Sequence, residues 1–179
     1  GIVAQPESLL GELPLLTETE RIQQLVTWNP VAAAVPESGS LHAMFEAQVI
    51  KTPMQMAIAC DGVQLTYAQL NKRANQLAHY LREQGVGPEV AVGLCVKRSV
   101  DMVVGIFGIL KAGGAYVPID ADFPAARMAS LLNDSRAMCL VTQQALVNKM
   151  PTHELPIVCL DSDRGILTKK STDNPRNLS

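Results

Sequence analysis

Two carboxylates are the residues in this sequence best placed to contact a ligand. Asp120 ends the strand-like run AYVPID, and Asp122 lies two residues further on. Open α/β sheets bind ligands at that edge, so a ligand contact is one interpretation. The other interpretation is that Asp122 caps the next helix. Neither residue is assigned a catalytic role.

Lys111 and the pair Gly113-Gly114 lie just before the same strand. A phosphate site would need a glycine-rich turn between a strand end and a helix start, and neither G-x-G-x-x-G nor G-x-x-x-x-G-K-[ST] is present. These glycines instead follow a helix and precede a strand, so we expect them to end the helix and allow close backbone approach. We expect Lys111 to be exposed and to complement the negative end of the helix dipole, an interaction that stabilises a helix by about 0.3–1 kcal/mol.

The other groups that could do chemistry are three histidines and four cysteines: His42, His79, His153, Cys60, Cys95, Cys139 and Cys159. The histidines lack metal-ligand spacing, and we expect His79 and Tyr80 to be exposed near a helix end. The cysteines lie far apart without a C-x-x-C spacing, which favours buried free thiols in a reducing cytosol over disulfides or a metal site. We therefore predict a cytoplasmic protein and assign no catalytic, cofactor-binding or metal-binding residue.

The composition indicates one globular core. The chain has 179 residues, 47% of them hydrophobic, and a mean hydropathy of +0.13. Its net charge of -2 and scattered Lys and Arg make nucleic acid an unexpected partner. The longest apolar stretch, residues 102–110, is about half of the roughly 20 residues that span a bilayer, so no transmembrane helix is expected. The start, GIVAQPESLL, lacks an initiator Met, and we expect it to be cut from a longer chain.

The globular part should begin with two helices and a hairpin. Apolar residues at a spacing of four predict a helix over residues 41–50. Asp61-Gly62 lies between two runs of strand formers, which predicts a hairpin. Thr66 and Gln69 form a capping box for a helix over residues 67–84, which Gly85 should end. Its charged residues are expected to form a solvated face: Lys72, Arg73, Arg82 and Glu83.

From residue 90 onward, strand-like and helix-like segments alternate. The runs VAVGLCV, AYVPID, AMCLVT and PIVCLD are the expected strands, and a helix over residues 99–112, with Ser99 as its cap, joins the first two. Met128, Leu131 and Leu132 should form the buried face of the next helix. Repeated β-α-β units predict an α/β fold with an open, mainly parallel sheet that helices cover on both sides. The tail after Asp161 is expected to be a surface excursion.

Residues 1–40 look separate from this fold. Thr17 and Glu20 form another capping box, and Ile22, Leu25 and Val26 fall on one face of a short helix that we expect to dock, through Trp28, on the next domain. Residues 31–40, VAAAVPESGS, have the composition of a linker.

Several segments resemble one family. LTYAQLNKRANQLAHYLREQGV and LKAGGAYVPIDADFPAARMASLLNDS resemble the first two core motifs of the amino-acid adenylation domains of nonribosomal peptide synthetases. LPLLTETERIQQLVTWN resembles the linker that follows a condensation domain, and LHAMFEAQVIKTP resembles the opening helix of an adenylation domain. LDSD and STDNP resemble the segment before the family's phosphate loop, although Arg164 stands where the family often has an aromatic residue.

The resemblance implies three parts: residues 1–30, the end of a condensation domain with its linker helix; residues 31–40, a linker; and residues 41–179, an adenylation domain truncated before its phosphate loop and thus an incomplete first subdomain. A complete domain would use ATP and Mg²⁺ to make an aminoacyl adenylate and load it on the phosphopantetheine thiol of a carrier domain. The family's phosphate loop, side-chain pocket, ribose aspartate and catalytic lysine would all lie beyond Ser179. We therefore expect no activity from these residues alone, and self-association through an uncovered sheet edge.

Two alternatives stay open. The chain could be a non-catalytic docking module derived from an adenylation domain. It could also belong to a related acyl-CoA ligase or carboxylate reductase, although the linker-like segment at residues 13–29 argues against a free-standing ligase.

Overall fold

The computed structural model describes residues 15–29, 39–151 and 155–176, which belong to two compact units, Gly1–Glu37 and Ser38–Ser179. In the first unit the predicted capping box is confirmed: the Thr17 hydroxyl accepts from the Glu20 amide, and the Glu20 carboxylate accepts from the Thr17 amide. Helix α1 (Glu18–Ile22) continues into a π-helical turn, η2 (Gln23–Thr27), which was not predicted. Residues 30–38 lie outside the described residues, and docking through Trp28 stays a prediction.

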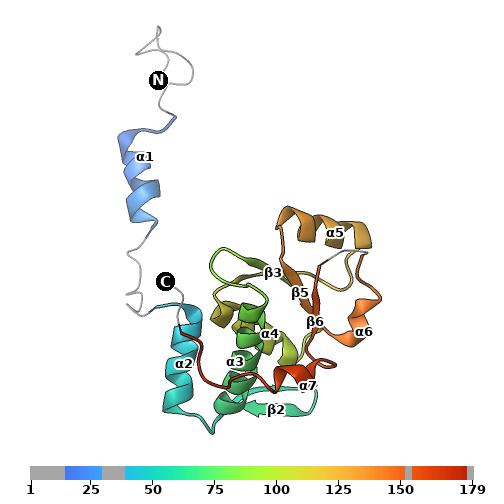
Figure 1. The fold of residues 1–179 in the computed structure, drawn as a ribbon. Coiled ribbons are helices and arrows are strands. Elements are labelled where there is room, and N and C mark those ends of the chain that lie inside the picture. Colours follow the sequence, from blue (N-terminus) through green and yellow to red (C-terminus); the bar gives the residue numbers. More distant parts are fainter. Residues whose placement is uncertain (1–14, 30–38, 152–154, 177–179) are drawn as a thin grey trace. The chain divides into compact units, whose positions relative to one another are not determined.

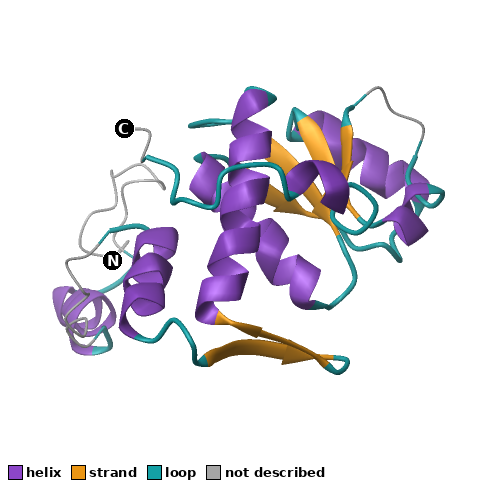
Figure 2. Ribbon diagram, turned by 60° about the horizontal axis from the view of Figure 1, so that its bottom comes forward, coloured by secondary structure: helices purple, strands orange, loops and turns teal. Residues whose placement is uncertain are grey.

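The second unit, called the globular unit below, begins with helix α2 (Leu41–Lys51) and a hairpin of β1 (Met56–Cys60) and β2 (Val63–Thr66). Asp61 and Gly62 turn the hairpin with φ of 49° and 78°, as the Asp-Gly pair predicts. The long helix α3 (Tyr67–Glu83) follows directly, and its predicted capping box, Thr66 with Gln69, is confirmed. Figure 2 shows this hairpin as a ribbon separate from the larger sheet.

The larger sheet has four parallel strands in the order β4-β3-β5-β6. They are β3 (Ala91–Cys95), β4 (Ala115–Pro118), β5 (Cys139–Thr142) and β6 (Ile157–Cys159). The connecting helices are α4 (Val100–Ala112), α5 (Ala125–Asp134) and α6 (Gln144–Val147), and a single turn, α7 (Arg164–Leu167), follows β6. The predicted fold class is therefore confirmed (Figure 1).

Alternate residues of the strands face two separate apolar clusters. Val92 and Leu94 of β3 join the cluster that contains the buried residues of α3 and α4. Cys95 and Leu140 join the cluster formed with α5 and α6. Because successive strand side chains point to opposite faces, helices must cover both sides of this sheet, as the apolar runs predict.

Glycines set the spacing around α4. Gly113 ends the helix with φ 96°, and a β-carbon on Gly114 would lie 3.0 Å from the Val90 carbonyl oxygen, so both glycines have the structural roles predicted for them. A β-carbon on Gly108 would overlap Leu77 of α3 and lie 2.8 Å from its Cγ. The two helices therefore pack closely at a residue that sequence reasoning did not single out.

One capping prediction is confirmed in position only, and another is wrong. Ser99 occupies the first cap position of α4, but its hydroxyl donates to the Lys97 carbonyl at 3.1 Å and makes no cap hydrogen bond. Helix α5 begins after Pro124, so Asp122 is not its cap. Proline is already suited to a helix start because its missing amide would have no partner there.

Two surface predictions also need correction. Arg82 is half-buried and donates to the carbonyls of Lys111 and Ala112 at 2.9 and 3.1 Å, so it caps the end of α4 rather than forming a solvated face. The tail after β6 is held against α3: Asn75 Nδ2 donates to the Thr172 carbonyl at 2.7 Å, and Pro175 is buried. Most of the described tail lies on the surface as expected, but it is packed against α3 rather than extending away from the fold.

Candidate functional site

A hollow of about 740 Å³ opens at the carboxyl ends of β3 and β4. Its wall includes apolar side chains of β3 and α4, and its charged lining residues are Lys97, Arg98, Asp120, Asp122 and Lys149. The expectation that the two aspartates lie at this edge is thus confirmed, whereas their contact with a ligand stays a prediction. Asp122 does not cap α5, and both carboxylates are exposed, with Lys149 beside Asp122.

The polar groups of this hollow are ordered by local contacts. Asp120 Oδ1 accepts from the Asp122 amide at 3.0 Å, and Lys149 Nζ lies 3.7 Å from Asp122 Oδ1. The ion pair is largely exposed, so it contributes at most about 1 kcal/mol. These charges are suited to orienting a polar ligand against an apolar wall.

Gln143 directly follows β5 and links the segments that follow β3 through two hydrogen bonds. The strands β3 and β5 are neighbours in the sheet, but the helices that follow them, α4 and α6, pack on opposite faces. Open α/β sheets bind ligands at the place where two neighbouring strands diverge in this way. Gln143 Oε1 accepts from the Lys97 amide at 3.1 Å, and its Nε2 donates to Asp101 Oδ2 at 3.0 Å. Sequence reasoning missed this residue, although its position directly after a buried strand was visible.

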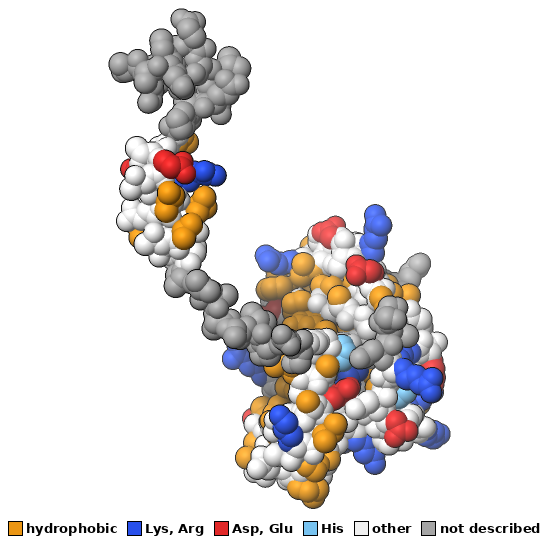
Figure 3. Space-filling model, turned by 90° about the vertical axis from the view of Figure 1, so that its left-hand side faces the viewer, with side chains coloured by type: hydrophobic (Ala, Val, Ile, Leu, Met, Phe, Trp, Pro, Cys, Tyr) orange, Lys and Arg blue, Asp and Glu red, His pale blue; other side chains and the backbone are white. Residues whose placement is uncertain are grey.

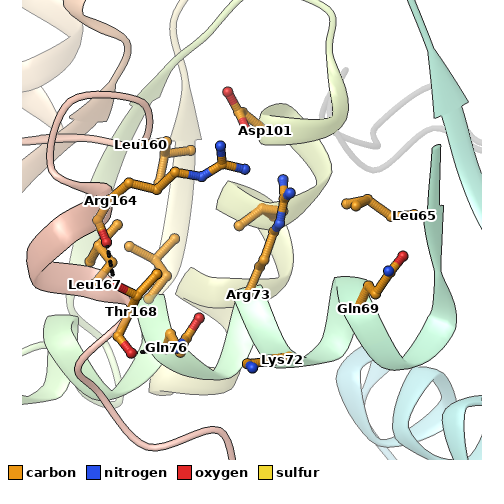
Figure 4. Close-up of a pocket in the computed structure, with 12 residues that line it drawn as sticks. Leu65, Gln69, Lys72, Arg73, Gln76, Asp101, Leu160, Arg164, Leu167 and Thr168 are labelled. Atoms are coloured by element: carbon orange, nitrogen blue, oxygen red, sulfur yellow. Dashed lines mark hydrogen bonds between the residues drawn. The ribbon is translucent and has the colours of Figure 1, made fainter. Parts of the chain in front are cut away.

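A second hollow, of about 410 Å³, lies between α3, α4 and α7. Figure 4 shows the Arg73 and Arg164 guanidinium groups pointing toward each other, with Asp101 beside them. Burial and, after it, the Arg164 charge lower the pKa of Arg73, while Asp101 acts in the opposite direction. Arg164, where the family pattern often has an aromatic residue, thus adds a second guanidinium group to this hollow.

Lys111 is buried, which corrects the expectation of an exposed residue at the helix end. Its side chain forms an ion pair with Glu46 of α2, and Nζ donates to Asn174 Oδ1 at 3.2 Å. The ammonium also lies 5.8 Å from the Phe45 ring centroid. Burial lowers the pKa of Lys111, and the hydrogen bond and charge of Glu46 oppose that change. These contacts give Lys111 a structural role that joins α4, α2 and the tail.

The histidines and cysteines do not assemble into a reactive cluster in the part of the chain that the structure describes. A His79 ring nitrogen lies 3.0 Å from the Asp173 carbonyl oxygen, and this half-buried residue and Tyr80 are not exposed as expected. His153 lies outside the described residues. All four cysteines are free, three of them buried, and burial raises the pKa of Cys95 and Cys139 to about 11. Thiols in that state are poor nucleophiles. Among the described residues, no three His, Cys, Asp or Glu side chains are grouped to hold a metal.

Comparison with known proteins identifies the class. Residues 45–177 match the family described as AMP-binding enzyme, and the chain belongs to that family. It is 44% identical, over all of its length, to a linear gramicidin synthase of Brevibacillus parabrevis, and 42% identical over 98% of its length to chondramide synthase cmdD of Chondromyces crocatus. The chain spans only 4% and 5% of those proteins.

Solved structures agree with this result. A crystal structure of the nonribosomal peptide synthetase FmoA3 with alpha-methyl-L-serine-AMP bound matches 81% of this chain, with a TM-score of 0.75 and 33% identity, over 16% of its own chain. The N-terminal subdomain of Klebsiella oxytoca NpsA matches 78% of this chain with a TM-score of 0.66 and 18% identity, over 35% of its own length, which shows likeness of fold alone. No described helix of the present structure is long and apolar enough to cross a membrane.

Proposed function

We propose that residues 41–179 act as the N-terminal part of an amino-acid adenylation domain, that residues 1–30 are the end of a condensation domain with its linker helix, and that residues 31–40 join them. One observation carries the proposal. The similarity to a linear gramicidin synthase covers the whole chain, including residues 13–29, which precede the family match that starts at residue 45. A related acyl-CoA ligase or carboxylate reductase would not account for that upstream similarity.

In this proposal the complete domain activates an amino acid with ATP and Mg²⁺ and transfers it to a carrier-domain phosphopantetheine. Metal and cationic groups stabilise the charge that develops in such reactions. In this proposal the residues described above have structural roles and do not react. Helix α4, the glycines at its end and β4 form one edge of the sheet. Three buried free thiols support a cytoplasmic location, because a reducing compartment maintains them.

A chimera tests the proposed function. Residues 41–179 would replace the matching segment in a complete adenylation domain of tyrocidine synthase 3, which is 47% identical over 150 residues. We expect amino-acid-dependent ATP–pyrophosphate exchange within about tenfold of the parent rate, or about 1.4 kcal/mol in activation free energy. In the matched control, the same segment of the parent domain is removed and reinserted with its own sequence, using identical junctions. A chimera that folds with the parent's melting temperature but has no exchange would contradict the proposal.

The 179-residue chain alone is expected to give no exchange with any proteinogenic amino acid, since its sequence holds no phosphate-loop motif. Exchange above background would contradict this expectation. If the 179-residue chain binds an intact synthetase and the chimera is inactive, the two results together would instead favour a docking module.

A further inference from the structure

The hollow between α3, α4 and α7 contains an unusual concentration of positive charge. Lys72, Arg73 and Arg164 line it, and Asp101 is the acidic residue among its lining side chains. The two guanidinium groups come from helices far apart in sequence and point toward each other (Figure 4). Like charges held at close range repel, so an arrangement of this kind is favourable when an anion lies between them.

Arg73 and Arg164 differ from Arg82 in having no hydrogen-bonded partner for their guanidinium groups within the described residues. Within residues 15–29, 39–151 and 155–176, no hydrogen bond or ion pair occupies the Arg73 or Arg164 side chain. Asp101 is already engaged, because its Oδ2 accepts from Gln143 Nε2 at 3.0 Å. Arg82 shows the contrast, since both of its bonds go to backbone carbonyls at the end of α4. Arg73 and Arg164 thus remain available to a ligand.

The remaining lining indicates what kind of ligand fits. Leu65, Leu77, Val104, Leu160 and Leu167 provide an apolar wall beside the cations. Gln69, Gln76 and Thr168 add neutral polar groups to the lining. A guanidinium group binds phosphate through two parallel hydrogen bonds, and two such groups match a doubly charged head better than a singly charged one.

We propose that this hollow binds a phosphate monoester, with the dianionic head between Arg73 and Arg164 and an apolar body against the leucines. The proposal does not depend on the adenylation function. The site lies between α3, α4 and α7, away from the hollow at the carboxyl ends of β3 and β4, with which it shares no lining residue.

Calorimetric titration of the full chain tests the proposal, with inorganic phosphate, monobutyl phosphate and butanoate as probes. We expect one saturable site per chain with a Kd of about 1 mM or below for monobutyl phosphate, which corresponds to about -4 kcal/mol. Inorganic phosphate should bind more weakly because it lacks the apolar body, and butanoate more weakly still because it carries one charge. Binding should weaken as salt is raised.

Variants separate the site from a general charge effect. Arg73→Gln and Arg164→Gln should each weaken binding of monobutyl phosphate about tenfold, the loss of one charge-assisted contact. Arg176→Gln, an exposed arginine outside the lining, makes the same charge change and should leave affinity within about twofold, as expected for a screened distant charge. Asp101→Asn should tighten binding several-fold, because it removes a negative charge from the lining that repels the bound anion. Melting temperatures of all variants identify any that fail to fold.

The proposal is overturned if the parent chain shows no saturable binding of monobutyl phosphate. It is also overturned if Arg176→Gln weakens binding as much as the two site variants, or if butanoate binds as tightly as the phosphate monoester. If Arg73→Gln does not fold, Arg164→Gln and Asp101→Asn still decide the outcome, because their expected effects have opposite signs.

Discussion

At the scale of single residues, the buried Lys111 shows how the environment of a side chain determines its role. Its side chain is fully buried, whereas that of its partner Glu46 is 20% exposed. Removing the partner of a buried charge leaves that charge unpaired, which is more costly than removing the charge itself. The two halves of this ion pair should therefore respond differently to substitution.

Glu46→Ala should destabilise the globular unit by about 3 kcal/mol, because it leaves Lys111 buried without its carboxylate. Lys111→Met should cost only about 1 kcal/mol, since methionine fills much of the same volume and Glu46 can still reach water. Urea unfolding of both variants checks the difference. If Lys111→Met destabilised the protein more than Glu46→Ala, the prediction that the unpaired buried lysine is the costlier change would be contradicted.

The buried thiols predict a loss of stability at alkaline pH. Cys95 and Cys139 have a pKa raised from the ordinary 9.0 to about 11, so above pH 9 the folded chain keeps protons that the unfolded chain loses. Stability should therefore fall as pH rises from about 9 toward 11, by about 1.4 kcal/mol for each thiol and pH unit. The free energy of unfolding, measured across this range, should fall less steeply for Cys139→Ala than for the parent. Equal slopes would contradict the assignment of the effect to this thiol.

At the scale of elements, the contact between α3 and α4 depends on a missing side chain. Gly108 faces Leu77, and any β-carbon there would overlap the leucine. Alanine favours a helix over glycine by about 1 kcal/mol, but overpacking a rigid core costs typically 1–3 kcal/mol. The cost of overpacking should exceed the gain in helix propensity, because Leu77 is itself fully buried.

Gly108→Ala should therefore destabilise the protein by about 1–2 kcal/mol despite its better helix propensity. Gly165→Ala in α7 is the matched control, because nothing lies within 4 Å of its added β-carbon, and it should be neutral or slightly stabilising. In a double-mutant cycle, Leu77→Ala should remove most of the cost of Gly108→Ala. Thermal unfolding measures the four proteins of the cycle and the Gly165→Ala control. Additive effects of the two core substitutions would rule out the close contact.

At the scale of the whole molecule, the globular unit leaves apolar surface uncovered. Figure 3 shows hydrophobic side chains gathered on one face of this unit. Ile50 and Met54, in and just after α2, are 80% and 79% exposed, and Tyr116 on the outer strand β4 is 39% exposed. Open sheet edges and apolar patches of this kind favour association.

The isolated chain is therefore expected to self-associate at micromolar concentrations. Sedimentation velocity across a dilution series should show species larger than 19.3 kDa that decrease on dilution. Ile50→Lys together with Met54→Lys should shift the distribution toward monomer, whereas Lys51→Met, between them in sequence, should not. A parent chain that remains a monodisperse monomer at all concentrations would contradict this expectation.

Local rules were enough to predict most of the elements from sequence. The two capping boxes, the Asp-Gly hairpin and the left-handed Gly85 and Gly113 all depend on residues close in the chain, and the structure has each of them. The apolar strand runs likewise fixed the class of sheet, because strands buried on both faces must be apolar throughout.

Only the tertiary structure decided which polar groups are buried and which meet. Lys111 is buried because Phe45 and Glu46 approach from α2 and Asn174 approaches from the tail, contacts that no local pattern encodes. Arg73 and Arg164 share a hollow for the same reason. The sequence by itself thus determined most of the elements, the order of the strands along the chain and the resemblance to adenylation domains, whereas η2 and α7 were not predicted. Side-chain environment depends on long-range packing, so both the role of Lys111 and the paired arginines emerged only once the chain was folded.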